Sequence, residues 1–242
     1  MKQHPILFST PMVQAILEGR KTMTRRIIKP QPIDNTEEDG NFFEGNHKGY
    51  VKVDGHPYWR DQFVHEFSKK QVGDVLWVKQ SFTVLDWWDE DMAVEIRYED
   101  AKSALCYLDD DEWKKFEKWK DKSGKKSSLF MFKSMSSIWL EITGIRVERL
   151  QDISPGDACC EGIEYWNIDW DALEGGELQA DFKNYTWTEK KEADPNYEDR
   201  WFPTFANPID SFRTLWQSIN GADSWSANPW VWVISFRKIE KP

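Results

Sequence analysis

Cysteine and histidine are scarce in this 242-residue chain, which has 3 cysteines and 4 histidines. Cys106, Cys159 and Cys160 are odd in number and lack the C-x-x-C spacing of zinc sites, which argues against a disulfide framework and fits a reducing cytoplasm. The histidines lack the i, i+4 spacing of a helical metal pair. We therefore expect no metal and no cofactor.

Long apolar runs are also missing. Residues 1–8 contain no signal-peptide core, and no later run approaches the roughly 20 apolar residues that a membrane helix needs, so no membrane association is expected. No G-x-G-x-x-G motif, Walker loop or nucleophile-elbow serine occurs, which leaves dinucleotide, NTP and α/β-hydrolase chemistry without support. The net charge of -10 argues against a long nucleic-acid-coating surface.

Tryptophan, by contrast, is abundant, with 15 residues. Such rings mostly fill cores, and they also stack on bases. A hydrophobic content of 40% is enough for a buried core. We expect a single domain over residues 1–242, with long insertions at about 34–70, 99–135 and 165–207, the first of which is irregular.

Apolar periodicity and capping residues predict the regular elements. Strands are expected at 6–8, 22–28, 75–78, 94–98, 139–150 and 229–237, and helices at 10–19, 109–122, 154–162 and 209–219. Several strands with few, short, capped helices indicate an α+β fold built on a small mixed β-barrel and enlarged by long loop insertions.

The segment 19–26, which reads Gly-Arg-Lys-Thr-Met-Thr-Arg-Arg, concentrates positive charge in an acidic chain. Five cations fall within ten residues: Arg20, Lys21, Arg25, Arg26 and Lys29. Arginine suits bidentate contact with phosphate and stacking on base planes. The segment is therefore a candidate site for a nucleotide or a nucleic acid, with an ordinary solvated turn as the alternative.

Lys21 and Thr24 offer a second possibility within the same segment. A hydroxyl becomes a useful nucleophile when a neighbouring base takes its proton, and a desolvated lysine can be that base. Farther along the chain, Glu161 falls in the last turn of the helix predicted at 154–162, where the helix dipole disfavours a carboxylate. A surface glutamate before the capping Gly162 is the plain explanation of that position.

Four stretches, 6–26, 73–78, 140–162 and 212–237, together resemble the phage-type ASCH-domain proteins, whose fold is PUA-like. The last is especially specific, with Leu-Trp-Gln-Ser-Ile-Asn-Gly at 215–221 and Ala-Asn-Pro-Trp-Val-Trp at 227–232. The resemblance implies a pseudo-barrel of five or six strands and a partner that is RNA or a modified nucleoside or nucleotide. For a phage protein it also implies the cytoplasm of a bacterial host.

ASCH proteins include the bacterial N4-acetylcytidine amidohydrolases, which use a lysine, a threonine and a glutamate. Their G-x-K-x-x-T motif matches Gly19, Lys21 and Thr24. Their glutamate-bearing segment aligns without gaps onto residues 150–163 and places the carboxylate at Glu161. The resemblance thus implies Thr24 as nucleophile, Lys21 as its activator and Glu161 as acid/base.

Two departures from the phage-type pattern affect the expected ligand contacts. Gln80 stands where relatives commonly have an acidic residue, and 131–133 reads Met-Phe-Lys where they have Met-Pro-Arg. The candidate ligand-binding residues are Arg20, Arg25, Arg26, Trp77, Lys79, Gln80 and Lys133.

Three functions remain open. The first is a binding module for nucleic acid or modified nucleotides that uses a basic cleft around residues 21–26. The second is an amidohydrolase of N4-acylated cytidine or a related base. The third is a ribonuclease, as certain ASCH relatives are, or a phage adaptor whose insertions bind a host protein. The sequence does not determine the oligomeric state.

Overall fold

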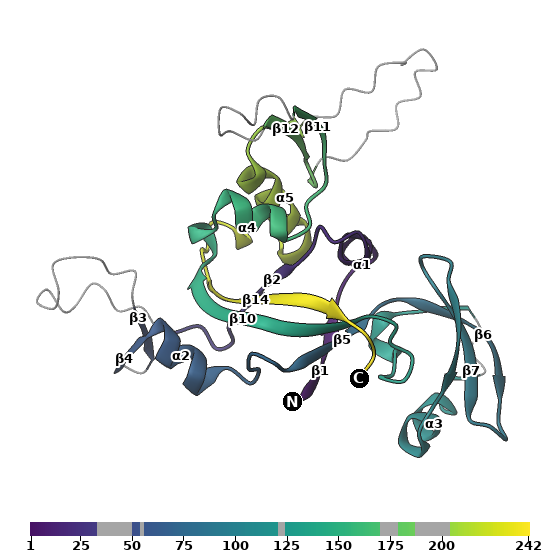
Figure 1. Cartoon of the computed structure of the whole chain (residues 1–242). Helices are drawn as coiled ribbons and strands as arrows, with labels where there is room; N and C mark the ends of the chain where they lie inside the picture. Colours follow the sequence, from purple (N-terminus) through teal and green to yellow (C-terminus); the bar gives the residue numbers. More distant parts are fainter. Residues whose placement is uncertain (33–49, 54–55, 121–123, 170–178, 187–203) are drawn as a thin grey trace, which may run out of the picture. The chain divides into compact units, whose positions relative to one another are not determined.

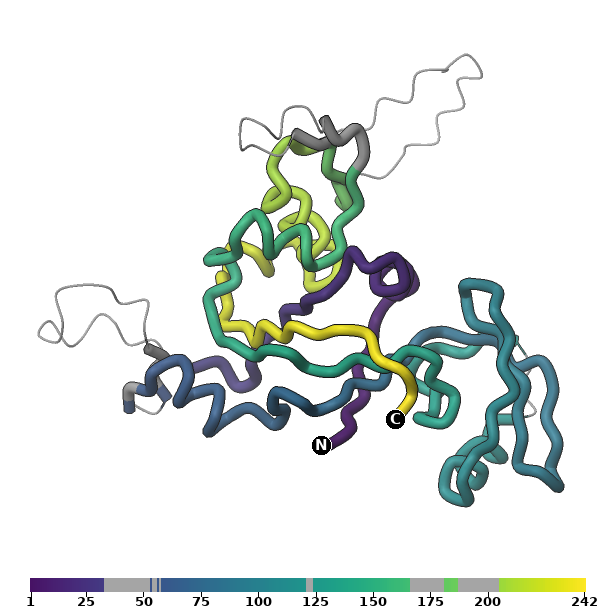
Figure 2. Tube along the Cα trace, in the orientation of Figure 1, coloured from purple at the N-terminus to yellow at the C-terminus, as the bar shows by residue number. Residues whose placement is uncertain are grey.

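The computed structural model describes residues 1–32, 50–53, 56–120, 124–169, 179–186 and 204–242, whose path is traced in Figure 2. They cluster into two compact units. The first unit comprises Met1–Gly19, Lys69–Gly144 and Ser235–Pro242, and the second comprises Arg20–Ser68 and Ile145–Ile234. Among these residues, no helix has the length and apolar character needed to cross a membrane.

The largest sheet has five strands in the order β1-β5-β10-β14-β2 (Figure 1). Its strands are β1 (Gln3–Leu7), β5 (Val75–Lys79), β10 (Trp139–Arg149), β14 (Trp230–Ile239) and β2 (Met23–Ile27). β1 pairs with β5 in parallel, and β10 pairs with β5 in antiparallel orientation. The order is linear and no closed barrel forms among the described strands. The α+β class is confirmed.

The first unit also holds a four-stranded antiparallel sheet in the order β8-β7-β6-β9. Its strands are β6 (Phe82–Trp88), β7 (Ala93–Tyr98), β8 (Ser103–Tyr107) and β9 (Gly124–Lys126). Helix α3 (Asp110–Phe116) is capped by the Asp109 carboxylate, which accepts from the amide of Glu112, and its Trp113 and Phe116 pack into the core of this sheet. Residues 99–135, predicted as an insertion with a helix at 109–122, supply β8, α3, β9 and the 3-10 turn η2 (Ser128–Phe130). Helix α1 (Thr10–Leu17) completes the unit.

In the second unit, α4 (Pro155–Cys160) and α5 (Pro208–Asn220) lie together near β2 (Figure 1). Met23, Leu150, Phe212, Trp216 and Val231 form their shared core. The remaining elements are β3 (Tyr50–Val53), β4 (His56–Trp59), α2 (Arg60–Phe67), η3 (Leu150–Asp152), β11 (Tyr165–Asp169), β12 (Gln179–Lys183), β13 (Thr204–Phe205) and η5 (Ala222–Ser224). The insertions predicted at 34–70 and 165–207 lie only partly within the described residues.

Asp74 anchors the N-terminal strand of the first unit. Its Oδ1 accepts a 2.7 Å hydrogen bond from the amide of Lys2, and its Oδ2 lies 3.1 Å from His4 Nε2 and accepts from the amide of Gln71 at 3.1 Å. Burial alone would raise the pKa of the Asp74 carboxyl. These hydrogen bonds stabilise the charged form by more, so the pKa lies below the ordinary aspartate value. A carboxyl whose pKa is lower in the folded chain stabilises the fold above its unfolded pKa and loses that contribution in acid.

We expect Asp74→Asn to lower the free energy of unfolding by about 2 kcal/mol at pH 7, because hydrogen bonds to a charged acceptor are lost. The difference from the wild type should shrink as the pH falls below about 4, the ordinary pKa of aspartate, because the wild-type carboxyl is then protonated too. Urea unfolding at pH 7 and pH 3 measures both values. An equal difference at the two pH values would contradict this role for Asp74.

Candidate functional site

The basic segment 19–26 joins α1 to β2, and its backbone is paired with the C-terminal end of α4. Gly19 ends the α1 turn with a φ of 79°, a conformation that glycine adopts at little cost. The backbone of Lys21 then forms an isolated antiparallel bridge with Glu161. The amide of Thr22 donates to the carbonyl of Cys160 at 3.0 Å. Backbone pairing therefore holds Lys21 beside the C-terminal end of α4.

Helix α4 forms where capping residues predict it. The Ser154 hydroxyl accepts from the amide of Asp157 at 3.1 Å, Pro155 takes the first helical position, and Gly162 follows the helix with a φ of 84°. Asp157 and Glu161 are four residues apart, so they lie on one side of the helix. The cap thereby directs two carboxylates toward β2.

Removing the cap should cost stability. We expect Ser154→Ala to lower the free energy of unfolding by about 1 kcal/mol, because the amide of Asp157 loses its acceptor. Ser218→Ala is the matched control, since that exposed hydroxyl of α5 donates to the Leu215 carbonyl one turn earlier and caps no helix N-terminus. Urea unfolding compares the two variants. Equal effects would show that the Ser154 cap contributes nothing particular to α4.

Lys21 and Glu161 form a buried ion pair. Lys21 Nζ donates to Glu161 Oε2 at 2.8 Å and to the Glu161 carbonyl oxygen at 2.7 Å. The two side chains are 0% and 5% exposed, respectively. Burial lowers the pKa of the Lys21 amine, and the positive charge of Arg26 lowers it further. The Glu161 carboxylate acts in the opposite direction but does not cancel these effects, so the pKa lies below the usual lysine value.

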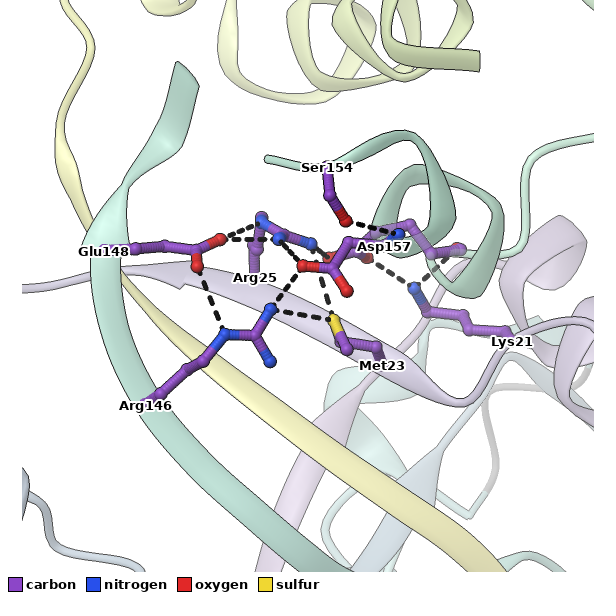
Figure 3. A network of polar contacts seen from close by, with 8 residues as sticks. Lys21, Met23, Arg25, Arg146, Glu148, Ser154 and Asp157 are labelled. Carbon is purple, nitrogen blue, oxygen red and sulfur yellow. Dashed lines mark hydrogen bonds and ion pairs between the residues drawn. The ribbon is translucent and has the colours of Figure 1, made fainter. Parts of the chain in front are cut away.

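Arg25 contacts three carboxylates at once (Figure 3). Its Nη1 donates to Glu161 Oε1 at 3.1 Å, and its Nη2 donates to Glu148 Oε1 at 2.5 Å and to Asp157 Oδ2 at 3.0 Å. The Arg25 side chain is 1% exposed. Burial lowers the pKa of this guanidinium, but the surrounding carboxylates raise it more, so the group keeps its charge.

Arg146 on β10 forms the solvent-facing end of the same cluster and is 41% exposed. Its Nε donates to Glu148 Oε2 at 3.1 Å, and its Nη2 donates to Asp157 Oδ2. We call the six joined residues the Arg25 network: Lys21, Arg25, Arg146, Glu148, Asp157 and Glu161. Its three cations balance its three carboxylates, as a buried cluster requires.

Apolar side chains surround the inner part of the Arg25 network. Met23 Sδ lies 3.5 Å from Arg25 Nη1, and the Phe212 ring centroid lies 5.8 Å from Arg25 Cζ. Figure 3 shows Met23 beside the two guanidinium groups. Water is largely excluded there, so electrostatic interactions are stronger than at a hydrated surface.

Thr24 does not join the Lys21–Glu161 pair by a hydrogen bond. The side chains of Met23 and Arg25 contact each other, so strand alternation turns the Thr24 side chain to the opposite face of β2. Thr24 is 3% exposed. Within the described residues its hydroxyl makes no hydrogen bond. The structure thus unites two members of the predicted catalytic triplet and places the third next to them in the chain.

The other cations of the basic segment are also engaged. Arg20 Nη1 donates to the Gly162 carbonyl at 2.9 Å and to the Ile163 carbonyl at 3.3 Å. Arg26 is half-buried. Burial lowers the pKa of its guanidinium, and the negative charge of Glu161 raises it by less. Much of the positive charge in residues 20–26 therefore serves contacts inside the second unit.

The remaining predicted ligand residues belong to the first unit. Lys79 Nζ donates to the Leu129 carbonyl at 2.8 Å and lies 5.6 Å from the centre of the Trp77 ring. Gln80 Nε2 donates to Ser137 Oγ at 3.2 Å. Lys133 is exposed. These four residues do not belong to the Arg25 network.

Arg146, Glu148 and Asp157 were not among the site residues predicted from the sequence. Arg146 and Glu148 alternate on one side of β10, and Asp157 resembles an ordinary acidic residue in the first turn of a helix. The signal that the sequence offered was a pair of opposite charges at i and i+2 on the strand predicted at 139–150. That signal alone does not reveal Arg25 as the shared partner.

A scan of family models, a search of curated proteins and a search of solved structures each found no match to this chain. A functional proposal therefore depends on the geometry of the Arg25 network and on the sequence motifs.

Proposed function

We propose that the chain is an ASCH-type, PUA-like amidohydrolase that removes the acyl group from the N4 amine of cytidine or a related base. The buried pair formed by Lys21 and Glu161 is the observation that carries the proposal. Its ammonium and carboxylate groups lie 2.8 Å apart, and they belong to the residues that match the lysine and the glutamate of the amidohydrolase motif. A buried lysine whose pKa is lowered by desolvation, beside a specific charge partner, is a candidate catalytic group.

The proposed reaction is acyl transfer to Thr24 followed by hydrolysis. Neutral Lys21 accepts the hydroxyl proton, and Thr24 Oγ bonds to the acyl carbon. The bond from the acyl carbon to N4 then breaks, and N4 takes a proton, with Glu161 as the acid/base of the site. Water cleaves the acyl ester, which releases the carboxylic acid and restores Thr24. The lowered pKa of Lys21 supports its part, because a neutral amine becomes accessible at lower pH.

The burial of Lys21 sets a requirement for this reaction. Its side chain is 0% exposed, and the Thr24 hydroxyl makes no hydrogen bond within the described residues. Substrate binding must therefore rearrange residues 21–24 so that the amine, the hydroxyl and the acyl carbon meet. Active-site segments commonly complete such an arrangement only on substrate binding.

The binding-module alternative has less support from the geometry. That hypothesis needs arginines that are available to phosphates or bases. Arg25 is instead 1% exposed and bound to three carboxylates, and Arg20 donates to two main-chain carbonyls. Phosphate binding by Arg25 would require breaking a buried, charge-balanced cluster.

The deciding experiment is a chromatographic assay of N4-acetylcytidine incubated with the full chain, which measures cytidine and acetate. Lys21→Met is the low-activity reference, and labelled RNA incubated with EDTA tests the ribonuclease alternative in parallel. We expect the wild type to release cytidine and acetate in equal amounts and much faster than Lys21→Met. No cytidine above the Lys21→Met background, across a series of N4-acyl chain lengths, would overturn the proposal.

A further inference from the structure

The β8-β7-β6-β9 sheet of the first unit has one buried and one exposed face. On the buried face, Val94, Ile96 and Cys106 pack with Trp113 and Phe116 of α3. Figure 1 shows α3 beside β6 and β7. Cross-strand register places other residues on the opposite face, which we call the outer face.

Exposed aromatic residues gather on the outer face. Trp88 pairs with Ala93, and Ala93 pairs with Tyr107, so the three side chains form one row across β6, β7 and β8. Trp88 is 42% and Tyr107 65% exposed, while Leu105, two residues earlier on β8, is 50% exposed. Clustered exposed apolar side chains mark interaction surfaces, whereas single ones are ordinary.

The aromatic row is bordered by acidic residues. The turn after Trp88 and the segment after β8 together supply six exposed carboxylates: Asp89, Glu90, Asp91, Asp109, Asp110 and Asp111. The amide of Leu108 donates to the Met92 carbonyl at 2.9 Å, which brings the two acidic segments to the same end of the sheet. Lys120 contacts Asp89, and Arg97 lies farther along the outer face. The aromatic end therefore carries a strong negative charge.

The β8 strand is also suited to strand addition. Within the described part of the chain it pairs with β7 alone and forms one edge of the sheet. Its sequence, Ser-Ala-Leu-Cys-Tyr, contains no proline and no charged residue. Proline and charge are the usual means by which proteins block an edge from pairing with another chain.

We propose that the outer face and the β8 edge bind an extended, lysine- and arginine-rich segment of a partner protein. Main-chain pairing to β8 would supply affinity, as in other strand-addition complexes. Cationic side chains would meet the six carboxylates and lie over the rings of Trp88 and Tyr107. The same carboxylates repel phosphates, which disfavours a nucleic acid on this surface. The surface lies in the first unit and is independent of the proposed Lys21 chemistry.

Fluorescence anisotropy of labelled peptides with the full chain tests the proposal. The probe is a 12-residue peptide that alternates arginine or lysine with threonine, compared with the same peptide carrying glutamate in place of each basic residue. We expect the basic peptide alone to bind, with an affinity that falls as salt is added. Tyr107→Ser should weaken binding about fivefold, and Tyr107→Arg should weaken it further.

The charge contribution is tested by a triple variant, Glu90→Gln with Asp91→Asn and Asp110→Asn, which should weaken binding about tenfold and flatten the salt dependence. Controls that should bind like the wild type are Leu129→Ser, exposed in the same unit, and Asp223→Asn with Glu240→Gln. Equal binding of the acidic peptide, or unchanged affinity in the Tyr107 and triple variants, would overturn the proposal. A single-stranded oligonucleotide whose binding is lost in Tyr107→Ser, or a dimer of the chain that this variant dissociates, would also overturn it.

Discussion

Arg25→Met is expected to lower the free energy of unfolding by about 3–5 kcal/mol, the usual cost of removing one partner from a buried ionic cluster. The reason is that three carboxylates, those of Glu148, Asp157 and Glu161, lose a charged hydrogen-bond donor at once. Glu148 and Asp157 keep Arg146, and Glu161 keeps Lys21. Urea unfolding at neutral pH measures the loss. A change below about 1 kcal/mol would show that these carboxylates do not depend on Arg25.

Two further variants separate geometry from charge. Arg25→Lys keeps the positive charge, but a lysine ammonium cannot span three carboxylates as the planar guanidinium does, so most of the loss should remain. Arg213→Met removes an arginine that is 41% exposed and paired at i, i+3 with Asp210. It should change stability by no more than about 0.5 kcal/mol. Comparable losses for Arg25→Met and Arg213→Met would contradict the assignment of Arg25 as the centre of the network.

Local chemistry made α4 predictable from sequence. Ser154, Pro155 and Gly162 supply a cap, a compatible first residue and a terminator, and the helix forms between them. The helix predicted at 109–122 also begins at its aspartate cap, but it ends at Phe116. No glycine or proline follows that residue to mark the end, and such unmarked ends are poorly fixed by local sequence.

Pairing between distant strands was not predictable in the same way. The parallel β1–β5 pair joins segments about seventy residues apart, and no local periodicity specifies that partner. The Arg25 network has the same origin, because its members come from three distant stretches of chain: residues 21–25, strand β10 and residues 157–161. The amidohydrolase motif indicated Lys21 and Glu161 together, but nothing in the local sequence indicated that Arg25 would bind Glu148 and Asp157.

Lys21→Met is expected to reduce the turnover of N4-acetylcytidine by about 10²–10⁴, the range typical of removing a proton-transfer group. Its effect on stability should be smaller than that of Arg25→Met, because Glu161 keeps its 3.1 Å hydrogen bond from Arg25 and the buried methionine avoids the desolvation of an ammonium group. This contrast distinguishes a catalytic Lys21 from a purely structural one. A structural lysine would lose activity only in proportion to the fraction of unfolded protein.

The pH dependence provides the second test of Lys21. Because the proposed mechanism uses the neutral amine, wild-type kcat/KM should rise with pH through the pKa of Lys21, which burial holds below the usual lysine value. The residual activity of Lys21→Met should lack that rise, while Lys29→Met, which removes an exposed lysine just after β2, should keep the wild-type profile. The free energy of unfolding should also rise with pH in this range. The folded chain binds the Lys21 proton less tightly than the unfolded chain does, so Lys21 stabilises the fold more as the pH increases toward the ordinary lysine pKa. A wild-type profile identical to that of Lys21→Met would remove Lys21 from the mechanism.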